Sequence, residues 1–94
     1  MAIKIDPSVQ EKLKSRHGVT FSDVVECFAT REKSLLEDTR TANRTNPPTL
    51  WFISDTFMGV ILKVVFIQDG EDSVVKTAYA PNDEELRIYN KFAK

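Results

Sequence analysis

The spacing of apolar residues changes near residue 30, and this change divides the chain into two parts with different predicted structure. Before that point the apolar residues follow a helical repeat of i, i+3, i+4 and i+7. The residues at these positions are Phe21, Val24, Val25 and Phe28. Val9, Leu13 and His17 form a narrower stripe at i, i+4 and i+8. We therefore expect two short helices, each with one face against a core.

Local signals mark where these two helices begin and end. Asp6 suits the N-cap of the first helix, and Pro7 suits its first turn, where the missing N–H is not needed. Gly18 supplies the left-handed residue that ends this helix. The hydroxyl of Thr20 can accept a hydrogen bond from the amide near Asp23, which predicts the start of the second helix.

After residue 30 the pattern becomes that of strands and turns. The segments expected as strands are 34–38, 50–53, 60–67 and 74–80. The segment 60–67 is the longest apolar run, and only Lys63 interrupts it, as is typical of a central strand covered on both faces. Residues 39–48 read as a polar loop, and Asp69-Gly70 is a hairpin signal.

The order of these elements predicts an α+β fold. A short strand at residues 3–5 precedes the two helices, and a helix with Leu86 and Tyr89 inward follows Pro81. Strands joined by short connections pair antiparallel. We expect an antiparallel four-stranded sheet with two N-terminal helices and one C-terminal helix, the helices gathered on one face.

Length and composition place the chain among small globular proteins. Ninety-four residues make a single domain, 1–94, and 41% hydrophobic residues suffice for a core. No apolar run reaches the length of a membrane span, and the N-terminus lacks the apolar stretch of a signal peptide. The lone Cys27 cannot form an internal disulfide or a zinc site by itself. We expect a cytoplasmic protein without metal or other cofactor.

Charge restricts the kind of nucleic-acid site that the chain can carry. The net charge is −1 and the isoelectric point is near 5.8, whereas proteins that grip phosphates usually show a basic surface. Any RNA site must therefore be a local cluster of basic side chains.

Several side chains have both a chemical and a structural interpretation. His17 is a candidate general base, or it fills the stripe with Val9 and Leu13. Lys63 in a strand either faces a phosphate or lies at a sheet edge open to solvent. Tyr79 can donate a proton or stack on a base, or it is a core aromatic with its hydroxyl at the rim.

The remaining candidates are weaker. Arg40 and Arg44 on the polar loop can clamp a phosphate or can simply be solvated. Trp51 is expected in the core, and Cys27 beside Phe28 is expected to be inert.

Three segments together resemble the BrnT-like branch of the RelE/ParE toxin superfamily. These segments are Arg16-His17-Gly18-Val19-Thr20-Phe21, the strand Leu62 to Phe66, and Thr77 to Asn82 followed by Glu85 and Tyr89. The resemblance covers nearly the whole chain. It departs from the family pattern at Tyr79 and Ala80, which stand where the family has two arginines. A subgroup with the words Pro-Pro-Thr-Leu-Trp-Phe-Ile and Lys-Thr-Ala-Tyr is often labelled ADP-ribosyl-(dinitrogen reductase) hydrolase.

The resemblance implies the toxin component of a type II toxin–antitoxin system. Such a protein is a metal-independent ribonuclease that acts on messenger RNA and is held inactive by a cognate antitoxin. On this basis His17 or Tyr79 would transfer protons, while Arg44, Lys63 and Lys76 would stabilise charge.

Two other functions remain open: a non-catalytic protein-binding module on the same fold, and an ADP-ribosyl-protein hydrolase that would need metal ions. The edge at residues 34–38 and the acidic segment 83–85 are expected antitoxin contacts, and the same edge can form a homodimer.

Overall fold

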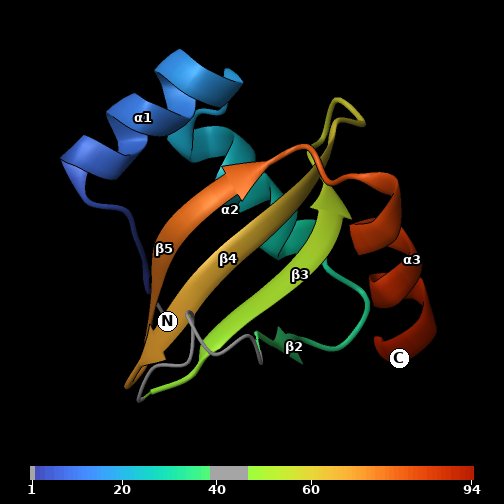
Figure 1. Ribbon diagram of the computed structural model, residues 1–94. Coiled ribbons are helices and arrows are strands. Elements are labelled where there is room, and N and C mark those ends of the chain that lie inside the picture. Colours follow the sequence, from blue (N-terminus) through green and yellow to red (C-terminus); the bar gives the residue numbers. More distant parts are fainter. Residues whose placement is uncertain (1, 39–46) are drawn as a thin grey trace.

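The computed structural model describes residues 2–38 and 47–94 and has the element order expected from the sequence (Figure 1). The elements are β1 (Ala2–Lys4), α1 (Pro7–His17), α2 (Phe21–Thr30), β2 (Leu36–Glu37), β3 (Thr49–Asp55), β4 (Ile61–Asp69), β5 (Asp72–Tyr79) and α3 (Asp83–Phe92). The described residues therefore form an α+β fold with three helices, as predicted.

The sheet differs from the predicted one in strand number and direction. It has five strands in the order β1-β5-β4-β3-β2, and β1 pairs parallel to β5, with Ala2 opposite Asp72. The prediction of four antiparallel strands was wrong because the direction in which a three-residue strand pairs is not encoded in its own pattern. The direction depends on how α1 and α2, which follow β1, connect it to the rest of the sheet. The partner strand β5 begins about 70 residues after β1.

One face of the sheet is covered by the two N-terminal helices. Phe52 and Phe66 point to this face, which we call the α1/α2 face, and the ring of Phe28 from α2 packs edge-on against both. The ring centroids are 4.9 and 5.2 Å apart, and both sheet phenylalanines are almost fully buried. Burying aromatic side chains in this way supplies much of the stability of a domain of this size.

The third helix lies on the opposite face, which we call the α3 face. Trp51 in β3 points away from α2, and its ring lies 5.6 Å from that of Tyr89 in α3. The expectation that all helices gather on one face was therefore wrong. Side chains alternate along a strand, so the apolar residues of β3 and β4 that point away from α2 need a cover of their own.

The local signals read from the sequence are confirmed. Asp6 accepts a hydrogen bond from the amide of Ser8, and Gly18 ends α1 with a φ of 65°. Thr20 and Asp23 form a reciprocal capping box at the start of α2. Within residues 2–38 and 47–94, no helix has the length and apolar character to cross a membrane.

Candidate active site

A buried lysine lies on the α3 face, near one end of the central strand β4. Lys63 stands in β4 between Ile53 of β3 and Tyr79 of β5, and only 6% of it is exposed. Its Nζ atom donates a hydrogen bond to Oε2 of Glu85 at 2.6 Å. A buried ammonium requires such a partner, because desolvation without compensation would destabilise the fold by several kcal/mol.

Glu85 is oriented by the first turn of α3. Its Oε1 atom accepts a hydrogen bond from the backbone amide of Asn82 at 3.0 Å, and Asn82 Oδ1 accepts one from the amide of Glu85 at 2.8 Å. This capping box leaves Oε2 free to accept hydrogen bonds from the Lys63 ammonium and from the Tyr79 hydroxyl, the latter at 2.8 Å. One carboxylate thus joins a helix start to two sheet strands.

These contacts shift the pKa values of both acidic groups. Burial by itself raises the pKa of Glu85, but the hydrogen bonds from Lys63, the Asn82 amide and Tyr79 outweigh it and lower the pKa below its ordinary 4.5. Burial, followed by the bond to the Glu85 carboxylate, raises the pKa of Tyr79 above 10.0. At neutral pH Glu85 is therefore an anion and Tyr79 a proton donor.

Aromatic rings surround the lysine. Its Nζ atom lies 4.5 Å from the ring centroid of Trp51 and 5.7 Å from that of Tyr79, within the range of cation–π attraction. The expected burial of Trp51 is confirmed, since only 8% of it is exposed. The interpretation of Lys63 as a sheet-edge residue open to solvent was wrong.

His17 approaches the same site from the end of α1. Its ring centroid lies 5.8 Å from that of Tyr79, and the histidine is exposed. The structural interpretation, in which His17 continues the buried stripe with Val9 and Leu13, was wrong. By the last turn of α1 this stripe has passed the edge of the core, so that its final member lies beside the end of β5.

The structure thus brings three predicted site residues together: His17, Lys63 and Tyr79. Lys76 is not one of the group. It is exposed, stands where a β-bulge interrupts the β4–β5 pairing, and acts electrostatically on Asp6 at the start of α1. Arg40 and Arg44 lie outside the described residues.

Sequence reasoning missed Glu85 as a member of this site. Two signals pointed to it: an isolated lysine in an apolar strand needs an anionic partner, and Asn82 followed three residues later by Glu85 is the pattern of a capped helix start. Neither signal locates the pair, because Lys63 and Glu85 are 22 residues apart in the chain.

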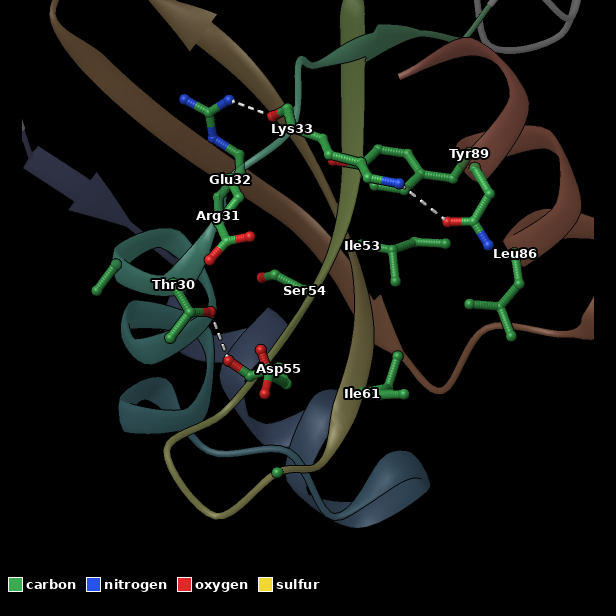
Figure 2. A pocket seen from close by; sticks show the side chains of 13 residues that line it. Thr30, Arg31, Glu32, Lys33, Ile53, Ser54, Asp55, Ile61, Leu86 and Tyr89 are labelled. Atoms are coloured by element: carbon green, nitrogen blue, oxygen red, sulfur yellow. Dashed lines mark hydrogen bonds between the residues drawn. The ribbon is translucent and has the colours of Figure 1, made fainter. Parts of the chain in front are cut away.

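Apart from this cluster, a hollow lies between β3, α3 and the segment that follows α2 (Figure 2). Some of its polar groups are bonded to one another: the Thr30 hydroxyl donates to the Asp55 carbonyl at 2.6 Å, and Lys33 Nζ donates to Asn90 Oδ1 at 3.3 Å. None of the residues predicted to act in chemistry lines it. We therefore place the candidate active site at the cluster around Lys63.

Two further sequence predictions concern cysteine and metals. Cys27 is fully buried, and burial raises the pKa of its thiol to about 11, which disfavours the thiolate at neutral pH. Among the described residues, no three His, Cys, Asp or Glu side chains come together as a set of metal ligands.

Comparison with models of protein families finds no match for this chain, and comparison with curated proteins finds none either.

Proposed function

We propose that this protein is the toxin component of a type II toxin–antitoxin system and cleaves messenger RNA in the cytoplasm without a metal ion. The observation that carries the proposal is the convergence of His17, Tyr79 and Lys63 from three separate elements at one end of the sheet. All three were candidates from the sequence alone, although Tyr79 stands where the BrnT-like family has an arginine.

The reaction is an internal transesterification. A base removes the proton from a ribose 2′-hydroxyl, and the 2′-oxygen attacks the neighbouring phosphorus. The bond between phosphorus and the 5′-oxygen breaks, and an acid protonates that oxygen. The products are a 2′,3′-cyclic phosphate and a 5′-hydroxyl, so no oxidant or co-substrate is consumed.

The roles follow from the chemistry of the groups and from their contacts. Because its pKa is raised, Tyr79 keeps its proton at neutral pH and suits the acid that protonates the leaving oxygen. His17, exposed beside the Tyr79 ring, suits the base. Lys63 supplies positive charge near the phosphorane, and Glu85 fixes the positions of both Lys63 and Tyr79.

Expression in a bacterial host tests the proposal. We expect the wild-type chain to slow growth and deplete messenger RNA, and Tyr79→Phe to relieve both effects because it removes the hydroxyl that is the proposed acid. Tyr89→Phe is a matched control, since it removes a tyrosine hydroxyl that donates to the Ser34 carbonyl and not to Glu85. The Arg44→Ala variant tests the predicted phosphate contact on the loop. Unimpaired growth and intact RNA at high expression of the wild type would contradict the proposal.

We also propose that a cognate antitoxin binds this chain and holds it inactive. A gene for a small DNA-binding protein beside this one, whose product co-purifies with the chain, would support that assignment. Failure to capture such a neighbour would contradict it.

A non-catalytic binding module is the second candidate function, and one observation favours it. The tip of the β3–β4 hairpin exposes two large apolar side chains, Phe57 at 70% and Met58 at 89%. Apolar side chains exposed side by side are typical of protein contacts. This function predicts partner binding without RNA loss. No observation favours the third candidate, an ADP-ribosyl-protein hydrolase.

A further inference from the structure

The turn between β3 and β4 exposes a cluster of apolar side chains. We call residues 57–61 the hairpin tip; its large side chains, each at least half exposed, are Phe57, Met58, Val60 and Ile61. Turns at the surface are normally rich in polar residues and glycine, because water solvates them. Neighbouring large apolar side chains on a protein surface usually mark a contact with another molecule. The tip therefore points to an occupant.

Hydrogen bonds hold the hairpin tip in one shape. The Thr56 amide donates to the Val60 carbonyl at 2.9 Å, and the Thr56 hydroxyl accepts from the Val60 amide at 3.1 Å. From α2, the carboxylate of Glu26 accepts a hydrogen bond from the amide of Phe57 at 2.8 Å. A turn that is fixed in this way loses little conformational freedom on binding, so its apolar side chains are preorganised for a contact.

The hollow between β3, α3 and the segment that follows α2 adjoins the hairpin tip. It has a volume of about 820 Å³ and is lined in part by Gly59 and Ile61 of the tip. Ile53 of β3 and Leu86 of α3 also line it, and Figure 2 shows them with Ile61 around the same space. One continuous surface thus carries a projecting apolar tip and, beside it, a hollow with apolar walls.

The charged residues that line the hollow have both signs. Arg31 and Lys33 are basic, Glu32 and Asp55 are acidic, and all four are exposed. A strongly charged partner is therefore not favoured, whereas a copy related by a two-fold axis can set each sign against its opposite. The whole chain has a net charge of only −1, so two copies repel each other little. These charges favour a second copy as the occupant.

The described residues on either side of 39–46 lie at the other end of β3 from the hairpin tip. Before this range, Asp38 donates its amide to the carbonyl of Thr49, the first residue of β3. Asp55, the last residue of β3, leads into the tip. The residues named for the tip and for the lining of the hollow all belong to the described chain.

We propose that two copies of this chain pair about a two-fold axis, with the hairpin tip of each copy seated in the hollow of the other. Because the tip and the hollow lie side by side and share Ile61, one rotation closes both contacts and leaves no tip free to add a third copy. The members of the candidate active site neither belong to the tip nor line the hollow: His17, Lys63, Tyr79 and Glu85. The proposal therefore stands apart from RNA cleavage.

The size of the contact sets its strength. The five residues of the tip and the 13 residues that line the hollow, two of them shared, fall short of the roughly 20–30 residues per side of a standard interface. We therefore expect a reversible dimer with a Kd in the micromolar range. Well below this Kd the chain is a monomer, and pairing then adds nothing to its stability.

Sedimentation equilibrium of the purified chain measures the association. We expect the average mass to rise with concentration from that of the monomer, 10.7 kDa, toward twice that value and no further. A monomer up to about 1 mM would overturn the proposal and leave the tip to another partner. Growth beyond the dimer would also overturn it, because tips and hollows that do not close on each other form open chains.

A charge at the tip tests its part in the contact. Met58 is 89% exposed and supports no core, so Met58→Asp should keep the fold, but in the dimer its carboxylate would be buried against apolar walls. We expect the Kd to rise about tenfold or more. Phe92→Asp places the same charge on another exposed apolar residue, at the end of α3, and should keep the wild-type Kd. Circular dichroism checks that both variants are folded. Equal effects of the two variants on the Kd would overturn the proposal.

Amide chemical shifts locate the contact. When the concentration is raised through the Kd, we expect the signals of residues 57–61 and those of residues 29–33, which line the hollow, to shift together. Shifts at the tip alone would indicate pairing of one tip with the other. Shifts at residues 34–38 in their place would indicate pairing along the sheet edge. Either result would overturn the arrangement of tip in hollow.

Discussion

The two faces of the sheet bury their side chains by different means. On the α1/α2 face, Phe52 and Val64 are fully buried among other apolar groups. On the α3 face, Lys63 is 6% exposed, and its charge is held by Glu85 and by the rings of Trp51 and Tyr79. Alternate residues of one strand, β4, therefore contribute to two different chemical environments.

We link the apolar α1/α2 face mainly to stability and the polar cluster of the α3 face to the proposed function. Apolar burial stabilises a fold whatever its activity, but a buried ion pair is often no more stable than apolar residues of the same size. In the described part of the chain, every buried side-chain nitrogen or oxygen has a hydrogen-bond partner. The polar cluster of the α3 face also reaches the surface at His17, and it is the site where we propose that chemistry takes place.

The largest expected loss of stability lies on the α1/α2 face. Phe52→Ala would leave a cavity between Phe28 and Phe66 and should lower the free energy of unfolding by about 3–5 kcal/mol. Urea denaturation measures this change. Phe57→Ala, at a phenylalanine that is 70% exposed, should change stability by less than about 0.5 kcal/mol. Similar losses in both variants would show that the α1/α2 face is not the main source of stability.

A smaller loss is expected when the ion pair of the α3 face is broken. Lys63→Met keeps the apolar stem but leaves the Glu85 carboxylate without its ammonium, and should lower stability by about 1–3 kcal/mol. Because the two groups act together, adding Glu85→Gln should restore part of the loss. Denaturation of the two single variants and the double variant completes the cycle, and strictly additive losses would contradict the coupling.

The smallest stability effect depends on pH. Because the pKa of Glu85 is lowered in the fold, its contribution is present above its ordinary value of 4.5 and is lost as the pH falls through the lowered value. Glu85→Gln, whose side-chain oxygen can still accept a hydrogen bond from Lys63, should therefore be less stable than the wild type by about 1 kcal/mol at neutral pH, and this difference should shrink as the pH falls below 4.5. Urea denaturation at several pH values measures it. A difference that stays constant or grows in acid would contradict the assigned shift.

The parts of the fold that sequence predicted are those fixed by neighbouring residues. The cap at Asp6, the left-handed Gly18 and the capping box at Thr20 each depend on residues within one turn, so the residues themselves encode them. The parallel pairing of β1 with β5 joins residues about 70 positions apart, and no local pattern contains it.

The candidate site could likewise be predicted only in part. His17, Lys63 and Tyr79 were singled out by residue type and resemblance, but their grouping depends on three elements meeting at one end of the sheet. The role of Glu85 could not be assigned, because a carboxylate in the first turn of a helix is explained by the helix alone. Lys76 had the right charge, but the bulge in the β4–β5 pairing places it apart from the others.

Cleavage of a single-stranded RNA by the purified protein in the presence of a chelator tests the central claim most directly. We predict 2′,3′-cyclic phosphate ends from the wild type and a rate about 10²–10⁴ times lower for Tyr79→Phe, the usual effect of removing a general acid. Tyr89→Phe, which removes the hydroxyl bonded to Ser34, should retain the wild-type rate. An intact RNA with the wild-type protein, or equal rates for wild type and Tyr79→Phe, would contradict the claim that the cluster on the α3 face is the active site.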